Sequence, residues 1–148
     1  MLHEKPLVEE IKLDGFQVVR SHYFSHAIDP CMTLFKTAIG FNLQAIEALH
    51  NCDKISVLVN EETRCILISP VLSNEPDGIS WRKAKKSYNK TECASFGRYL
   101  FETWHLNEQY RYRTRGRLVQ ADKKVMLLFD FSHPEIWNGK DLVKEDGK

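Results

Sequence analysis

Four arginines at alternate positions are the feature of this sequence that could do chemistry: Arg111, Arg113, Arg115 and Arg117. Successive side chains of a β-strand point to opposite faces, so the spacing predicts a strand with all four guanidinium groups on one face. Neighbouring positive charges repel one another, and acidic side chains, phosphates or water must compensate them. The row therefore predicts either a face that binds anions or a sheet face that is paired with carboxylates.

The positive charge of the chain is concentrated around this strand. The 148 residues carry a net charge of +1, but residues 1–81 carry −5, residues 82–117 carry +7 and residues 118–148 carry −1. Such asymmetry favours a polyanion as partner. We expect the basic segment to contact the phosphates of DNA, with Trp81 or Tyr88 packing against sugar or base. The residues expected to contact phosphate are Arg82, Lys83, Lys85, Lys86, Arg111, Arg113, Arg115 and Arg117.

Composition places the chain among globular proteins, with a single domain over residues 1–148. Hydrophobic residues make up 43% and charged residues 28%, which is ordinary for such a domain. No apolar run approaches the roughly 18 residues that span a bilayer, and the acidic, proline-containing start is unlike a signal peptide. We therefore expect a cytoplasmic protein that does not enter a membrane.

The sequence contains none of the common catalytic or ligand-binding motifs. The four cysteines include no C-x-x-C pair, and the histidines lack the spacing of a metal site. G-x-S-x-G, G-x-x-x-x-G-K-[ST] and H-E-x-x-H are all absent. Cys31 or Cys93 with a distant histidine is a pairing that any chain of this size offers. We expect a non-enzymatic protein without a metal, a cofactor or a small-molecule substrate.

Hydrophobic periodicity predicts short helices between strands. Apolar residues at helical spacing follow Asn42, a good N-cap, and recur between Phe96 and Trp104. Apolar runs on both sides of polar segments predict two hairpins. The expected elements are extended segments over 16–24 and 32–40, helices over 43–50 and 92–105, a hairpin over 54–70, a polar connector over 71–90, and the arginine strand followed by a turn over 120–124 and a strand over 125–131.

These elements predict an α+β fold with two βαββ-like halves, over 16–81 and 82–137, with antiparallel hairpins packed on short helices and a polar tail over 138–148. The halves share the order of their elements, and the hairpin 54–70 can be laid on 115–131 without a gap. Three residues match at a constant offset, pairing Phe41, Glu47 and His50 with Phe96, Glu102 and His105. One interpretation is an internal duplication whose halves pair about a pseudo-twofold axis. The other is two unrelated α+β segments.

The second hairpin can be registered by the burial of its apolar side chains. The predicted cross-strand pairs are Arg117 with Leu128, Arg115 with Asp130 and Arg113 with Ser132. The face expected in the core carries Tyr112, Thr114, Gly116 and Leu118 on one strand and Val125, Leu127, Phe129 and Phe131 on the other. Arg111 and Arg117 are left without an acidic cross-strand partner, so we expect them to be the most available charges.

Scattered residues between Val18 and Trp137 form a recognisable pattern. They are the stretch from Val18 to His26, Phe41-Asn42 with Ala45-Ile46, the stretch from Ser56 to Asn60, Trp104, Tyr110-Arg111-Tyr112, Gly116 and Phe129-Asp130. Together they resemble a family of short, uncharacterised proteins of phages and mobile elements of Gram-positive bacteria, often labelled "integrase". The catalytic set of a tyrosine recombinase and the carboxylates of an acidic-triad integrase are both absent. The resemblance therefore implies a mobile-element accessory protein that acts near DNA.

The order strand, short helix, hairpin over 32–70 is also similar to that of swapped-hairpin DNA-binding proteins of the AbrB kind. Those proteins dimerise or duplicate the unit, and they bind DNA with basic residues near the first strands. Because the first half of this chain is acidic, no DNA-contact position is carried over from them. The similarity implies a homodimer or a pseudo-dimer.

The leading hypothesis is a non-enzymatic, DNA-associated accessory protein of a mobile element that binds the phosphate backbone through its basic strand and connector. The alternative is a protein-interaction or assembly module in which the basic strand of one copy docks on the acidic first half of another. A third hypothesis is a small recombinase or nuclease accessory enzyme, which predicts metal-dependent nicking of plasmid DNA.

Overall fold

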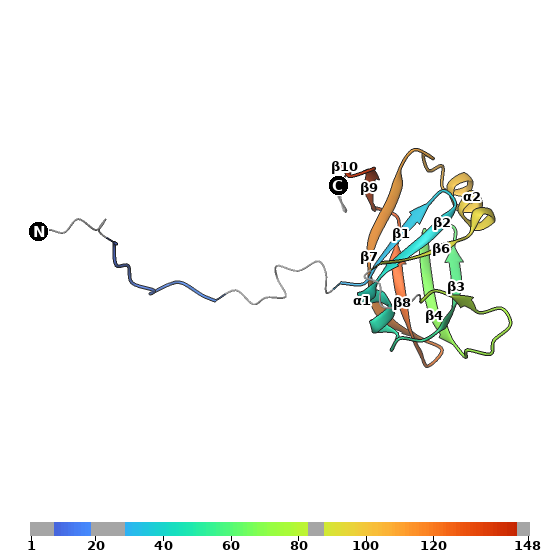
Figure 1. The fold of residues 1–148 in the computed structure, drawn as a ribbon, viewed down its shortest axis with the longest axis horizontal. Helices are drawn as coiled ribbons and strands as arrows, with labels where there is room; N and C mark the ends of the chain where they lie inside the picture. Colours follow the sequence, from blue (N-terminus) through green and yellow to red (C-terminus); the bar gives the residue numbers. More distant parts are fainter. Residues whose placement is uncertain (1–7, 19–28, 83–87, 145–148) are drawn as a thin grey trace, which may run out of the picture.

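The described part of the chain comprises residues 8–18, 29–82 and 88–144 of a computed structural model, and it contains ten strands and two short helices (Figure 1). The strands are β1 (Cys31–Phe35), β2 (Ala38–Asn42), β3 (Lys54–Asn60), β4 (Cys65–Val71), β5 (Ile79–Ser80), β6 (Tyr88–Glu92), β7 (Arg111–Ala121), β8 (Lys124–Asp130), β9 (Glu135–Asn138) and β10 (Asp141–Lys144). The helices are α1 (Leu43–Ala48) and α2 (Ala94–Thr103). Neither helix is long and apolar enough to cross a membrane.

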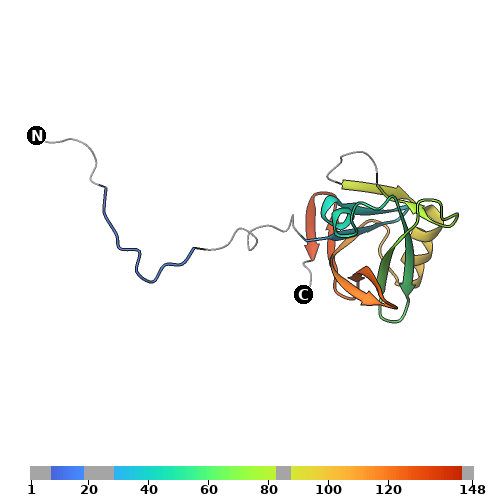
Figure 2. The same ribbon diagram turned by 90° about the horizontal axis from the view of Figure 1, so that it is seen from below.

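The strands form one antiparallel sheet that curls into a nearly closed barrel (Figure 1, Figure 2). Eight of them follow the order β5-β3-β4-β8-β7-β1-β2-β6, while β9 pairs with β7 and β10 with β9. At the two ends of this order, the Thr91 hydroxyl of β6 donates a hydrogen bond of 3.4 Å to the Ser80 carbonyl of β5. Curling the sheet in this way leaves little unpaired edge.

The predicted α+β class is wrong, because the fold consists mostly of antiparallel strands. Among the described residues, strands account for 47% and helices for 13%. Both predicted helices are present, but they lie on opposite sides of the barrel and add side chains to its core instead of covering one face of a sheet (Figure 1). Within the predicted polar tail over 138–148, residues Asp141–Lys144 form the exposed strand β10, which pairs with β9 as a hairpin. Pairings between remote strands, such as β1 with β7, close the barrel.

β7 is the longest strand and joins three neighbours. Its second half pairs with β8, with Arg117 opposite Leu128, so the predicted register is confirmed. Its first half lies between β1 and β9, where Tyr112 is opposite Leu34 on one side and Ile136 on the other. The alternation of side chains along β7 therefore fixes which faces of β1, β8 and β9 point into the barrel.

The pairing of β7 with β8 stops at Gly116. The chain from Ser132 to Pro134 then leaves the ladder, and proline has no N–H with which to continue it. When pairing resumes in β9, Arg113 is opposite Glu135. The predicted pairing of Arg113 with Ser132 is therefore wrong, and the change brings a carboxylate to the arginine row.

The predicted core face of the second hairpin is confirmed in the barrel and wrong at the hairpin tip. Tyr112, Thr114 and Leu127 are buried. Leu118 and Val125, close to the turn, are 52% and 50% exposed. Leu118 borders an open hollow beside Pro30 and α1, so packed side chains do not cover it.

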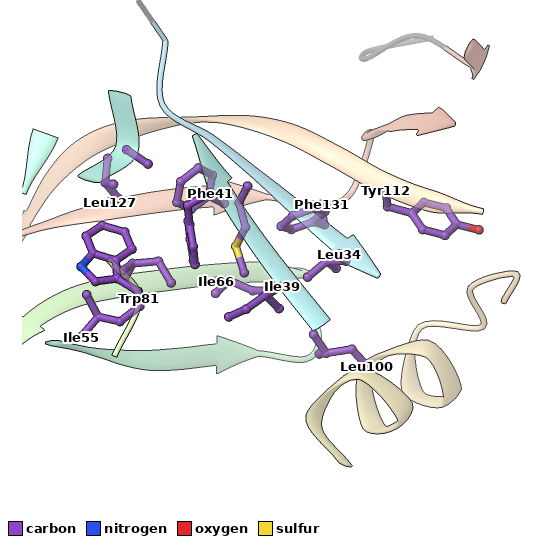
Figure 3. Close-up of a cluster of buried hydrophobic side chains, with 14 of the residues drawn as sticks. Leu34, Ile39, Phe41, Ile55, Ile66, Trp81, Leu100, Tyr112, Leu127 and Phe131 are labelled. Atoms are coloured by element: carbon purple, nitrogen blue, oxygen red, sulfur yellow. The ribbon is translucent and has the colours of Figure 1, made fainter. Parts of the chain in front are cut away.

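Alternate residues of the strands fill the barrel interior (Figure 3). Trp81, directly after β5, is fully buried, and its ring meets Phe41 edge-on at a centroid distance of 5.0 Å. Its indole N–H donates a hydrogen bond of 2.7 Å to the Cys52 carbonyl. Trp81 is therefore a core residue, and the expected contact of Trp81 with sugar or base is wrong.

Asn42 begins α1 and also fixes the start of β1. Its Oδ1 accepts hydrogen bonds from the Ala45 N–H at 3.0 Å and the Cys31 N–H at 2.9 Å, and its Nδ2 donates to the Asp29 carbonyl at 2.8 Å. The predicted N-cap is thus confirmed. One amide connects a helix to the strand that lies beside β7.

The order strand, helix, hairpin occurs twice, as β2-α1-β3-β4 and β6-α2-β7-β8. Corresponding strands also meet in antiparallel pairs, β2 with β6 and β4 with β8. The hairpin loops differ, spanning 61–64 in one and 122–123 in the other, so the predicted alignment without a gap is wrong. His50 and His105 follow the two helices with similar positive φ angles of 57° and 52°. The division into two halves stays a prediction.

Asn42→Ala removes all three hydrogen bonds of the Asn42 side chain, those with Cys31, Asp29 and Ala45. We expect the free energy of unfolding to fall by about 1–2 kcal/mol, because the helix loses its cap and the start of β1 loses its tie. Urea denaturation measures the change. Asn60→Ala is the matched control, since Asn60 caps only an exposed loop through Glu62 and Thr63. A loss in Asn42→Ala no larger than in this control would contradict the assigned role.

Candidate nucleic-acid interface

The arginine row lies on the outer face of β7, as its alternation predicted. Tyr112 and Thr114, which alternate with the arginines, are buried inside the barrel. Arg115 and Arg117 are exposed, and Arg111 and Arg113 are half-buried. The row therefore forms a charged outer surface on a strand whose other face is anchored in the core.

Glu135 of β9 compensates the middle of the row. Its side chain is only 13% exposed, and its Oε1 lies 3.3 Å from Arg113 Nη1. The same oxygen accepts a hydrogen bond of 3.1 Å from the Trp137 indole, while Oε2 lies 3.9 Å from Arg115 Nη2. Asp29 Oδ2 adds a second carboxylate at 3.8 Å from Arg115 Nε. Two of the four guanidinium groups are thus paired within the protein.

The arginines at the two ends of the row have no such partner. Within residues 8–18, 29–82 and 88–144, neither Arg111 nor Arg117 forms an ion pair. Arg111 lies over the ring of Trp137, with Cζ 5.6 Å from the ring centroid. Arg117 borders an open hollow of about 580 Å³ beside Pro30 and α1. Their cross-strand neighbours are not acidic, as predicted.

Asp130 does not pair with Arg115, so this prediction is wrong. Arg115 lies opposite Cys31 of β1. Asp130 instead accepts a hydrogen bond of 2.9 Å from the Ser132 N–H. Partial burial acts to raise the pKa of Asp130, but the Ser132 hydrogen bonds, with smaller contributions from His133 and Arg117, outweigh it, and this pKa lies below its usual value. The carboxylate is therefore used within the bend that ends β8.

Tyr88 of β6 reaches across β2 toward the row. A Cβ at Gly40 would overlap the Tyr88 hydroxyl, so the absence of a side chain there lets the ring cross the strand. Burial raises the pKa of Tyr88, although a hydrogen bond with Thr33 and the charges of Arg111 and Arg113 act in the opposite direction. The side chain remains 39% exposed. Of the two aromatic residues expected near DNA, only Tyr88 is available.

Of the basic connector, which carries Arg82, Lys83, Lys85 and Lys86, the structure describes only Arg82. Arg82 Nη2 lies 3.1 Å from Asp53 Oδ1, in an exposed ion pair beside β3. Its charge is thus paired with an acid that the arginine row does not use. Lys83, Lys85 and Lys86 lie outside the described residues.

A hollow of about 280 Å³ lies at the Arg111 end of the row. Two aromatic residues that line it, Phe35 and Trp137, each have a cationic side chain over the ring. Lys90 Nζ lies 4.4 Å from the centroid of the Phe35 ring, and Arg111 lies over Trp137 as described above. The hollow therefore combines ring surfaces with positive charge.

Phe35, Lys90 and Trp137 were missed as site residues by the sequence analysis. Phe35 and Lys90 approach each other because β2, the partner of β1, also pairs with β6. Trp137 reaches Arg111 because β9 pairs with the first half of β7. No local pattern in the sequence indicates these pairings, so the residues had no common signal.

Two thiols of the described residues, Cys31 and Cys93, are disfavoured as nucleophiles. Burial raises the pKa of the Cys31 thiol, with the charges of Arg113 and Arg115 opposing it, and burial also raises the pKa of Cys93. Raised thiol pKa values disfavour the nucleophilic thiolate. In the described ranges, no group of three or more His, Cys, Asp or Glu side chains is arranged to hold a metal ion.

Comparisons with protein-family models, with curated proteins and with solved structures gave no match for this chain.

Glu135→Gln removes the charge that Arg113 and Arg115 share. We expect the free energy of unfolding to fall by about 1–3 kcal/mol, because charged hydrogen bonds in a poorly solvated position are lost. Glu108→Gln is the matched control, since its ion pair with Lys36 at 3.2 Å is exposed and worth less than about 1 kcal/mol. Equal effects of the two substitutions in urea denaturation would show that Glu135 does not hold the row.

Proposed function

We propose that the protein binds the phosphate backbone of DNA across the outer face of β7, without catalysing a reaction on it. The observation that carries this proposal is the unequal compensation of the arginine row. Arg113 and Arg115 are held by Glu135, whereas Arg111 and Arg117 form no ion pair with any carboxylate of the described structure. Two available guanidinium groups, held at fixed positions on one strand, fit an anion with repeated charges.

The spacing of the row supports a polymeric ligand over a single small anion. Residues 111 and 117 are six positions apart, which corresponds to about 20 Å along an extended strand. Phosphates repeat along a nucleic-acid strand at intervals that are much shorter than this distance. One nucleic-acid segment can therefore meet Arg111 and Arg117 at once, with Tyr88 beside the path.

The resemblance to short proteins of phages and mobile elements favours DNA as the polyanion and an accessory role in such an element. The basic connector, with Lys83, Lys85 and Lys86, adds three further cations close to Tyr88 in sequence. Proteins that use such contacts bind with strong salt dependence and low sequence preference. The cytoplasmic location and the homodimer remain predictions within this proposal.

A salt titration of binding to a short DNA duplex tests the phosphate contacts. We expect Arg111→Gln and Arg117→Gln each to reduce the slope of log affinity against log salt by about 0.9, because each removes one phosphate contact. Arg113→Gln is expected to have a smaller effect, since Glu135 already compensates that charge.

Lys123→Gln, in the β7–β8 turn, is the control for loss of one exposed charge away from the row. Its slope should equal that of the wild-type protein. If the wild-type protein binds neither duplex nor single-stranded DNA at low salt, the proposal is wrong.

The assembly hypothesis is favoured by a second observation, at residues 8–18. This described segment forms neither helix nor strand, and it exposes five large apolar side chains, Val8, Ile11, Leu13, Phe16 and Val18. It also carries three acidic residues and one lysine. An acidic, apolar segment of one copy is complementary in charge to the arginine row of another, and the hollow beside Arg117 offers the apolar side chains of Pro30 and Leu118.

Sedimentation at low and high salt, without DNA, tests this second candidate. We expect salt-sensitive self-association that Phe16→Ser weakens, because the substitution removes the largest apolar side chain of the segment. A protein that stays monomeric at both salt concentrations would eliminate the assembly hypothesis and leave the DNA proposal unaffected.

A further inference from the structure

The hollow at the Arg111 end of the row has the chemistry of a nucleotide site. We infer that it takes one unpaired nucleotide of a single-stranded nucleic acid, with the base on its aromatic wall and the phosphate on its cations. This inference rests on the proposed function and deepens it, because it names single strands as the preferred ligand.

The two cation–aromatic pairs supply the groups that recognise a nucleotide. Unpaired bases stack on aromatic rings and on guanidinium planes, so the Arg111–Trp137 stack offers a surface that a base can extend. The Lys90 ammonium is held 4.4 Å from the Phe35 centroid, a contact that leaves its N–H donors free to meet a phosphate.

The lining of the hollow is positive overall. Lys36, Lys90 and Arg111 line it, and Glu108 is its one acidic lining residue. The Glu108 carboxylate is engaged by Lys36 at 3.2 Å. An anion that enters the hollow therefore meets two cations that no carboxylate of the described structure compensates, Lys90 and Arg111.

The size and position of the hollow fit a single nucleotide at the end of a longer contact. Its volume of about 280 Å³ lies just below the usual range for ligand pockets, which is about 300–1,000 Å³, so it can take no more than one small ligand. Arg111 belongs both to the hollow and to the row. A nucleic-acid strand whose phosphates follow the arginine row from Arg117 to Arg111 can thus place a base against Trp137. A base that is paired within a duplex is not available for this contact.

Tryptophan fluorescence can report on the hollow directly. The chain has three tryptophans, of which Trp81 and Trp104 are 0% and 2% exposed, so quenching by a ligand reports on Trp137. We expect saturable quenching by adenosine 5′-monophosphate, weaker quenching by inorganic phosphate, and a loss of affinity of several-fold in Lys90→Gln. Absence of saturable quenching, or equal affinity in Lys90→Gln, would overturn the site.

A pair of substitutions at Trp137 separates stacking from its hydrogen bond. Trp137→Leu and Trp137→Phe both lose the N–H that binds Glu135, but only the first loses the aromatic ring. We expect Trp137→Leu to weaken binding of a single-stranded oligonucleotide by about 5- to 150-fold, with duplex affinity unchanged, and Trp137→Phe to retain most of the affinity. Thermal melting verifies that both variants fold. If Trp137→Leu does not fold, Phe35→Leu tests the second ring of the hollow by the same binding measurement.

Tyr99→Leu is the control for an exposed aromatic residue on α2, outside the hollow. It should leave both affinities unchanged. Equal losses on single strands and duplex in Trp137→Leu, or no loss on either, would overturn the inference while the DNA proposal stands. If the wild-type protein binds neither oligonucleotide, the proposed function fails, and the strand-binding inference fails with it.

Discussion

The contact of Glu135 with two arginines is the interaction on which the outer surface depends. β7 cannot be shifted by one residue without moving its arginines into the core, so its outer face must accommodate four like charges. Glu135 reduces this repulsion at the centre, where Arg113 and Arg115 lie opposite β1. Because its side chain is largely screened from water, the compensation remains effective and holds the guanidinium groups in place. At the two ends of the row, Arg111 and Arg117 form no ion pair within the described residues.

The parts that the sequence predicted correctly are those governed by near neighbours. Asn42 precedes a helix because its short amide can accept the N–H of Ala45, three residues ahead. The register of Arg117 with Leu128 follows from a tight turn between two strands whose apolar faces must meet. In both cases the interacting residues are close in sequence, either three residues apart or on the two strands of one hairpin. Local chemistry alone was therefore sufficient.

The fold class and half of the site depend on contacts between remote strands. An α+β arrangement and a curled sheet use the same local elements, and only the pairing of β1 with β7 and of β2 with β6 separates them. The same pairings bring Lys90 to Phe35 and Trp137 to Arg111. Asp130 was assigned to Arg115 because the bend after β8 could not be foreseen. In that bend the Asp130 carboxylate accepts a hydrogen bond from Ser132, and β9 then brings Glu135, in place of Asp130, to the arginines.

The join between β5 and β6 gives the barrel a preferred place to open. β5 has two residues, and its join to β6 includes a side-chain hydrogen bond from Thr91. An apolar hollow of about 330 Å³, lined in part by Ile39, Ile79 and Phe96, lies along this join. Local unfolding begins where the fewest backbone hydrogen bonds must break. Amide protons along the free edge of β6 should therefore exchange with solvent well before those of β7, and the barrel should loosen as a sheet that uncurls.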